Sequence, residues 1–244
     1  MILEVDVGNS SLKWRVVDRE GGVLGSGRGT HEESGLDTVR SGFADLEAVR
    51  FASVAGEEVT DALYRQIFFL WGLKPSVAKT CKKMAGLEIV YEDPSRLGVD
   101  RWLAMLAAFH HAKGRVCVVD CGSAITVDLV GEGGRHSGGY IVPGIAMQTE
   151  MLVSSTGRIR MESEGDAHCR SWGRSTEQAV NHGILRMVAS FIDSVVAEQS
   201  SENGGTALYL CGGDAHRLRA VLESPERFSV KEDLVLDGLG IALP

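Results

Sequence analysis

The sequence of 244 residues has no run of about 18 apolar residues and no run of more than two lysines or arginines. A helix needs about 20 mostly apolar residues to cross a bilayer, so we expect no membrane-spanning segment. The net charge of −8 repels phosphodiester backbones, and no basic patch offsets it. Nucleic acids and membranes are therefore not expected partners.

The sequence also lacks the marks of secretion and of a cysteine-based site. Met1–Val7 reads as a strand, without a charged segment and cleavage site, so we expect a cytoplasmic protein. The cysteine count is odd and no C-x-x-C pair occurs, which favours reduced structural thiols. A metal role remains the alternative for Cys117 and Cys121, which share strand parity near an aspartate.

Two common nucleotide-binding motifs are missing. No G-x-x-x-x-G-K-[ST] occurs, which excludes a P-loop. Gly25–Gly29 has neither the third glycine spacing nor the following helix of a dinucleotide fingerprint, and we interpret it as a flexible turn. A nucleotide-binding site in this protein must therefore use a motif other than a P-loop or a dinucleotide fingerprint.

The chain is otherwise ordinary for a globular protein, with 44% hydrophobic and 24% charged residues. Residues 2–18 predict two strands joined by a Gly-Asn-Ser turn, followed by a third strand to about Arg28. Residues 49–54 predict a buried strand, and 60–71 a helix.

A second hairpin resembles the first at a distance of 114 positions, so that Asp6 and Gly8 correspond to Asp120 and Gly122. This spacing indicates a duplicated domain, because solenoid repeats have periods of roughly 20 to 50 residues. Chance similarity between two apolar hairpins is the alternative. We predict an α/β protein with domains at 1–115 and 116–244 and a central cleft between them.

Helices and strands alternate in the remainder of the chain. Residues 100–110 are apolar almost all round, which predicts a buried helix, and a further helix is expected at 146–154. Ser175–Gln178 is a capping-box pattern that begins a long helix with an apolar stripe at Val180, Ile184, Met187, Phe191 and Val195. Strands are expected at 138–144 and 206–211, and a helix at 215–222.

The first turn combines groups that ATP binding requires: backbone N–H donors and a cation for the phosphates, and a carboxylate that positions a metal ion or water. Gly8 permits close approach, and the other residues with suitable polar groups are Asp6, Asn9, Ser10, Ser11 and Lys13. An ordinary hairpin turn with a capping aspartate and a surface lysine is the alternative. The second turn, residues 120–126, offers another acid, glycine and two hydroxyls.

Asp100 is the candidate proton acceptor for phosphoryl transfer to an alcohol, because it follows a proline-containing loop at the start of a buried helix. Helix N-capping is an equal alternative. Arg101 could pair with a substrate carboxylate or form a structural ion pair. Gly212–Asp214 could let a nucleoside approach the backbone, or could be a simple strand-to-helix turn.

In order along the chain, these motifs resemble those of type III pantothenate kinases, relatives of the sugar and acetate kinases, actin and Hsp70-type ATPases. The matching segments are 6–13, Tyr91 with Pro94, 98–101, 120–124, 138–144, Ser175 with Thr176, and 212–214. Ser123 departs from the family pattern, which usually has threonine there but keeps the hydroxyl. Residues 154–160 match less clearly, so no substrate-facing residue is assigned to them.

The resemblance implies two ribonuclease-H-like halves, a homodimer, and ATP-dependent phosphorylation of pantothenate to 4′-phosphopantothenate, the first step towards coenzyme A. It implies a proton acceptor at Asp100 and a monovalent cation, potassium or ammonium, at Asp120, with Mg²⁺ carried by ATP. The implied ATP-binding residues are Asp6, Val7, Gly8, Asn9, Ser10, Ser11, Leu12, Lys13 and Ser123. The implied pantothenate-binding residues are Tyr91, Gly98, Val99, Asp100, Arg101 and, across the dimer interface, Thr176.

Other functions on the same fold remain as alternatives. A small sugar kinase or a polyphosphate phosphatase would share the phosphate turns but not Tyr91 and the 98–101 motif. A regulatory or transcription accessory protein would not turn over ATP with pantothenate. The acidic charge and the lack of a helix-turn-helix pattern disfavour direct DNA binding.

Overall fold

The computed structural model describes residues 1–157, 159, 171–200 and 205–244. The chain folds into two compact units: Met1–His110 with Asp233–Pro244, and His111–Glu232. The C-terminal segment thus packs in the first unit, whereas the sequence placed it in the second half. The division at residue 115 and the cleft between the halves stay predictions.

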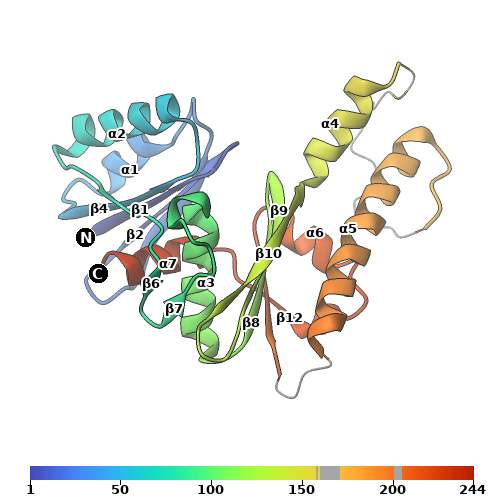
Figure 1. The fold of residues 1–244 in the computed structure, drawn as a ribbon. Helices are drawn as coiled ribbons and strands as arrows, with labels where there is room; N and C mark the ends of the chain where they lie inside the picture. Colours follow the sequence, from blue (N-terminus) through green and yellow to red (C-terminus); the bar gives the residue numbers. More distant parts are fainter. Residues whose placement is uncertain (158, 160–170, 201–204) are drawn as a thin grey trace. The chain divides into compact units, whose positions relative to one another are not determined.

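The first unit is built on a five-stranded sheet (Figure 1). In the order β3-β2-β1-β4-β5, its strands are Val23–Gly29, Leu12–Val17, Ile2–Val7, Ala48–Ser53 and Ser76–Val77. The first three run antiparallel, while β4 and β5 continue parallel to β1. Helices α1 (Leu36–Gly42) and α2 (Glu57–Trp71) cover one face, and α7 (Leu234–Ala242) contacts β1 and β4.

Apolar and charged side chains alternate along β1, so that one face of the strand is apolar and the other is polar. Leu3, Val5 and Val7 are fully buried in a core that includes residues of α1 and α2. Because successive side chains of a strand point to opposite faces, Glu4 and Asp6 lie on the other face. The alternation of apolar and charged residues along β1 therefore determines which face of the sheet carries the core and which carries the charged residues.

A short hairpin and a buried helix complete the first unit. Strands β6 (Lys83–Met84) and β7 (Leu87–Glu88) pair with each other, and the 3-10 turn η1 spans Pro94–Arg96. Helix α3 (Val99–Ala112) is buried along residues 101–108, as its apolar sequence predicts. It begins directly after the loop that carries the expected substrate residues.

The second unit repeats the first sheet in strand order and direction. In the order β10-β9-β8-β11-β12, its strands are His136–Pro143, Ala124–Val130, Val116–Cys121, Ala207–Cys211 and Phe228–Val230. The first three are antiparallel, and β11 and β12 run parallel to β8. The two sheets confirm the predicted α/β fold with a duplicated unit.

Helices α4 (Ile145–Ser155), α5 (Thr176–Ser200) and α6 (Ala215–Arg219), with the 3-10 turn η2 (Pro225–Arg227), accompany the second sheet. The expected capping interaction at the start of α5 is present, because the Gln178 N–H donates to Ser175 Oγ at 3.2 Å. Val180 and Ile184 of the predicted stripe are buried, but Met187 is 58% exposed. Among the described helices, none has the length and hydropathy needed to span a membrane.

The predicted third strand is confirmed as β3, so the separate interpretation of Gly25–Gly29 as a flexible turn is wrong. A Cβ at Gly27 would lie 2.5 Å from the Trp14 ring, and one at Gly25 would lie 2.8 Å from Phe43. The glycines therefore let aromatic rings lie directly against the strand, which explains a composition untypical of strands. Helices α1 and α7 were not predicted.

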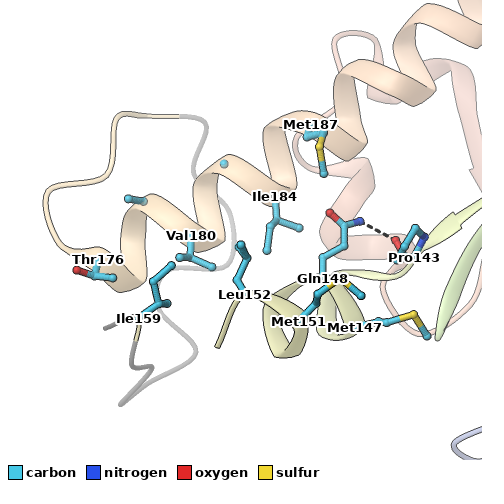
Figure 2. Close-up of a pocket in the computed structure, with 12 residues that line it drawn as sticks. Pro143, Met147, Gln148, Met151, Leu152, Ile159, Thr176, Val180, Ile184 and Met187 are labelled. Carbon is cyan, nitrogen blue, oxygen red and sulfur yellow. Dashed lines mark hydrogen bonds between the residues drawn. The ribbon is translucent and has the colours of Figure 1, made fainter. Parts of the chain in front are cut away.

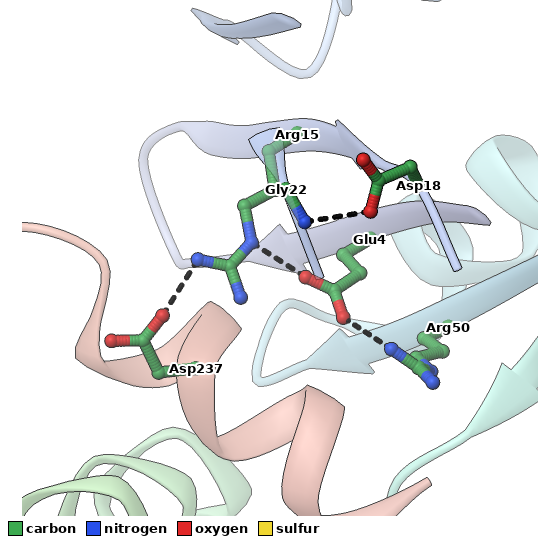
Figure 3. A network of polar contacts seen from close by, with 6 residues as sticks. All are labelled: Glu4, Arg15, Asp18, Gly22, Arg50 and Asp237. Atoms are coloured by element: carbon green, nitrogen blue, oxygen red, sulfur yellow. Dashed lines mark hydrogen bonds and ion pairs between the residues drawn. The ribbon is translucent and has the colours of Figure 1, made fainter. Parts of the chain in front are cut away.

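A buried ion network fixes α7 to the polar face of the first sheet (Figure 3). Glu4, whose side chain is 1% exposed, accepts from Arg15 Nε at 2.6 Å and from Arg50 Nη1 at 2.7 Å. Arg15 Nη1 also donates to Asp237 Oδ1 of α7 at 2.6 Å. Burial alone would lower the Arg15 pKa, but hydrogen bonds and charges from Asp237 and Glu4 raise it above its usual value.

We predict that Glu4→Gln destabilises the protein by about 3 kcal/mol, because it leaves buried guanidinium groups without their shared carboxylate. Urea unfolding followed by circular dichroism measures the change. Glu47→Gln is the matched control, since Glu47 is 51% exposed where it pairs with Arg19. Equal effects of the two substitutions on the unfolding midpoint would contradict this role for the network.

Candidate active site

The first candidate phosphate turn, Gly8–Ser11, connects β1 to β2. The Gly8 N–H donates to the Ser11 carbonyl at 2.9 Å, which closes the turn. Asn9, Ser10 and Ser11 are exposed, and Asp6 stands directly opposite Lys13 across the two strands. The turn thus brings a carboxylate, a cation and exposed polar residues together.

Val7 and Leu12, also expected to bind ATP, are 0% and 1% exposed. Their side chains point into the core between the sheet and its helices. Only their backbone groups could therefore face a nucleotide. Their side chains anchor the two ends of the turn to the core of the unit.

The second candidate turn connects β8 to β9 at the equivalent place in the second sheet. It is shorter, because only Gly122 and Ser123 separate the strands, and the Gly122 N–H donates to the Ala124 carbonyl at 3.1 Å. Asp120 stands opposite Thr126, as Asp6 stands opposite Lys13. A hydroxyl therefore takes the place of the ammonium group in the second copy.

Two glycines pack closely against the second turn. A Cβ at Gly144 would overlap the carbonyls of Gly122 and Ser123, and the Gly144 N–H donates to the Ser123 carbonyl at 3.0 Å. A Cβ at Gly212 would lie 2.5 Å from Asp120 Oδ1. These contacts hold the turn through backbone atoms, which explains why glycine occupies both positions.

Cys117 and Cys121 of β8 are buried thiols. Burial raises the pKa of Cys117 to about 12, and the Asp128 carboxylate adds to this shift. Burial also raises the pKa of Cys121 well above its usual value, with further contributions from Asp120 and Asp214. Both thiols stay protonated near neutral pH, which disfavours the metal role left open for them. Cys169 lies outside the described residues.

Clustered metal ligands would be a further sign of a metal site. In the parts of the chain that the structure describes, no group of three or more His, Cys, Asp or Glu side chains could hold a metal ion.

The expected substrate residues of the first unit lie at the start of α3 and in the loop before it. Arg101, 7% exposed, donates from Nη1 to Tyr91 Oη at 3.4 Å. The Lys82 ammonium group donates to the Tyr91 carbonyl at 2.7 Å, which fixes the loop. The structure therefore brings Tyr91 and Arg101 together although ten positions separate them.

Asp100 lies in the first turn of α3, where its Oδ1 accepts from the Arg101 N–H at 2.7 Å. A Cβ at Gly98 would lie 2.5 Å from the same oxygen. The carboxylate therefore folds back over Gly98, and only glycine leaves room for it. Val99 begins the helix beside it.

Thr176 is the first residue of α5 and lines an apolar groove between α4 and α5 (Figure 2). The groove has a volume of about 630 Å³. Met147, Met151 and Met187 line it and are 44%, 60% and 58% exposed. Met187 is exposed because it lines this groove, whereas the apolar stripe of the helix predicted that it would be in the core.

The expected site residues divide between the units. The first unit holds residues 6–13, Tyr91 and 98–101, and the second holds Asp120, Ser123 and Thr176. His31 contacts the first turn and was missed. It lies 23 positions from Gly8 in a polar loop, so no local pattern could have indicated it.

Two equivalent mixed sheets, each with a polar turn after its first strand, define a class of fold. Solved structures of other proteins share this fold, among them a protein of Sinorhizobium meliloti named for a 2-dehydro-3-deoxygalactonokinase, which aligns with 99% of this chain at a TM-score of 0.56 and 14% identity. The activator of 2-hydroxyisocaproyl-CoA dehydratase from Clostridium difficile, with bound ADPNP, is another neighbour. It aligns with 99% of this chain and 92% of its own at a TM-score of 0.54 and 13% identity.

A conserved protein of Campylobacter jejuni named for the Baf family of transcriptional activators aligns with 98% of this chain and 95% of its own. Its TM-score is 0.61 and its sequence identity 20%. At these identities the three neighbours show the fold alone.

Sequence comparison identifies the family. The model of the type III pantothenate kinase family matches residues 2–198. A type III pantothenate kinase of Pseudomonas putida strain W619 is 40% identical over 100% of this chain and 99% of its own length. The chain belongs to the type III pantothenate kinase family.

We predict that Gly212→Ala lowers Tm by about 2 to 8 °C, because residue 212 has a φ of +87° and its Cβ would press on Asp120. Differential scanning calorimetry measures the shift. The adjacent Gly213→Ala is the control, since a Cβ there meets no atom within 4 Å. A Tm for Gly212→Ala equal to that of Gly213→Ala would show that the close approach is not required.

Proposed function

We propose that this protein is an ATP-dependent kinase that transfers the γ-phosphate of ATP to the primary hydroxyl of pantothenate, giving 4′-phosphopantothenate. The observation that carries the proposal is the match to a type III pantothenate kinase over the full length of the chain, with the family model matching residues 2–198. Tyr91 and the 98–101 motif, which a sugar kinase would not share, favour pantothenate, and the contact between Tyr91 and Arg101 is consistent with one pocket that uses both.

In this proposal the Gly8–Ser11 turn binds the ATP phosphates. Its exposed polar residues supply hydrogen bonds and Lys13 supplies a positive charge, while Ser123 provides a hydroxyl from the second unit. Preorganised donors of this kind stabilise the charge that develops during phosphoryl transfer. Mg²⁺ would arrive with ATP and neutralise part of the phosphate charge.

Asp100 is the proposed proton acceptor. The hydroxyl oxygen of pantothenate attacks the γ-phosphorus, the bond to the β-phosphate oxygen breaks, and the hydroxyl proton passes to the Asp100 carboxylate. The carboxylate is held against Gly98 and the Arg101 N–H, so its position is fixed before substrate binds. Arg101 would pair with the pantothenate carboxylate.

Asp120 is the proposed site of a monovalent cation. Two oxygen donors lie close together there, since a Cβ at Gly212 would be 2.5 Å from both Asp120 Oδ1 and the Cys121 carbonyl oxygen. Potassium or ammonium suits such oxygen ligands. A cation there would offset phosphate charge in a protein of net charge −8.

A second copy of the chain is the proposed partner at the groove between α4 and α5. Exposed apolar surface of this kind marks interaction sites, and the three methionines give it an adaptable lining. Thr176 at the groove would then stand next to the partner, where it could complete the partner's pantothenate pocket.

The proposal predicts ADP release that depends on pantothenate and not on sugars. Asp100→Asn should lower kcat by about 10² to 10⁴, because general-base catalysis contributes that much, while affinity for ATP stays nearly intact. A coupled assay gives kcat, and calorimetry gives the affinity for a non-hydrolysable ATP analogue. Asp61→Asn, at an exposed position of α2, is the control. An undiminished kcat for Asp100→Asn would remove Asp100 from this role.

Activity should require potassium or ammonium. At constant ionic strength, replacing potassium chloride by sodium chloride should reduce turnover to near background. Sodium carries the same charge but is smaller, so oxygen ligands spaced for potassium would replace its hydration shell poorly. Initial rates over a titration of each salt measure the effect. Equal rates in sodium alone would count against a cation at Asp120.

Met151→Lys should convert a dimer to a monomer, since it places a charge in the apolar groove. Sedimentation velocity measures the assembly. Phe69→Lys is the control, because Phe69 is 86% exposed on α2 and does not line the groove. An unchanged sedimentation coefficient for Met151→Lys would exclude this surface as the interface.

A further inference from the structure

His31 contacts the candidate phosphate turn from the loop after β3. Its Nε2 lies 2.9 Å from the Gly8 carbonyl oxygen. A carbonyl only accepts, so Nε2 carries the proton and donates this hydrogen bond. The imidazole is half-buried, so the bond is partly shielded from water.

The loop that carries His31 is held beside the turn by its own contacts. Gly29, the last residue of β3, pairs with Leu12 at the start of β2. After it, the Thr30 N–H donates to the Glu33 carbonyl at 3.1 Å, and the Glu33 N–H donates to Thr30 Oγ1 at 3.0 Å. His31 therefore stands on a closed turn rather than on a free loop.

The bond to Gly8 has a consequence for the next residue. The peptide unit is planar and trans, so the Gly8 carbonyl and the Asn9 N–H point in opposite directions. Glycine offers little resistance to rotation of this unit, because it has no Cβ. A donor that holds the carbonyl therefore also fixes the direction of the Asn9 N–H, away from His31.

We propose that His31 is a positioning residue for nucleotide binding, which holds the Gly8–Asn9 peptide so that the Asn9 N–H is directed at an ATP phosphate. This rests on the proposed function of the Gly8–Ser11 turn. The ligand is the triphosphate of the nucleotide, and His31 acts on it through the backbone rather than by contact.

The test compares His31→Ala with His31→Gln, whose side-chain amide can reach the same carbonyl. Calorimetry with a non-hydrolysable ATP analogue measures binding without turnover. His31→Ala should weaken affinity roughly threefold to tenfold, the effect of one lost hydrogen bond, and His31→Gln should stay within about twofold of the native protein. His110→Ala, exposed at the end of α3, is the control.

The kinetic parameters separate positioning from general damage. KM for ATP should rise in His31→Ala, while kcat at saturating ATP and KM for pantothenate should change little. Unchanged affinity in His31→Ala, or equal losses in the Ala and Gln variants, would overturn the proposal. Nucleotide binding without pantothenate turnover would instead overturn the proposed substrate and leave the His31 comparison intact.

A measurement on the native protein tests the same bond without any substitution. Long-range ¹H–¹⁵N NMR reports which ring nitrogen carries the proton. The proposal requires the proton on Nε2 of His31 when the ring is neutral. The opposite tautomer would overturn it even if the variants failed to fold.

Discussion

The alternation of side chains along β1 is the constraint on which the first unit depends. Leu3, Val5 and Val7 enter the core, so Glu4 and Asp6 must occupy the opposite face. There, Glu4 binds two arginines and, through Arg15, the C-terminal helix. Asp6 stands opposite Lys13 at the end of the same strand. A shift of one residue in register would exchange the two faces and remove the core and the candidate phosphate turn together.

The second unit uses the same constraint with different contacts. Cys117, Val119 and Cys121 of β8 enter the core, which leaves Asp120 on the polar face. Here, the turn is held by backbone packing from Gly144 and Gly212 rather than by a histidine in a neighbouring loop. Each turn thus receives its support from a segment distant in sequence. The two turns are held by different contacts, and we propose different roles for them: phosphate binding for the first turn and cation binding at Asp120 beside the second.

Much of the fold could be predicted from the sequence because its strongest signals are local. The hairpins, the buried helix α3 and the cap of α5 follow from alternation, apolar content and the Ser175–Gln178 pattern. The parts of the structure that the sequence did not predict depend on contacts between residues that lie far apart in the sequence. The third strand was predicted, but its glycines were also interpreted as a turn because the aromatic rings that cover Gly25 and Gly27 come from other segments. Helix α7 was missed, and its ion pair to the first sheet joins Asp237 to Arg15 across 222 positions. His31 reaches Gly8 only once β3 has paired with β2.

The central claim is that the Gly8–Ser11 turn binds the phosphates of ATP while Asp100 faces the hydroxyl of pantothenate. A crystal structure with a non-hydrolysable ATP analogue and pantothenate tests both parts at once. The account predicts phosphate oxygens within hydrogen-bonding distance of the turn's N–H groups, and the primary hydroxyl of pantothenate beside the Asp100 carboxylate. Phosphates bound elsewhere, or a pantothenate hydroxyl out of reach of Asp100, would contradict it.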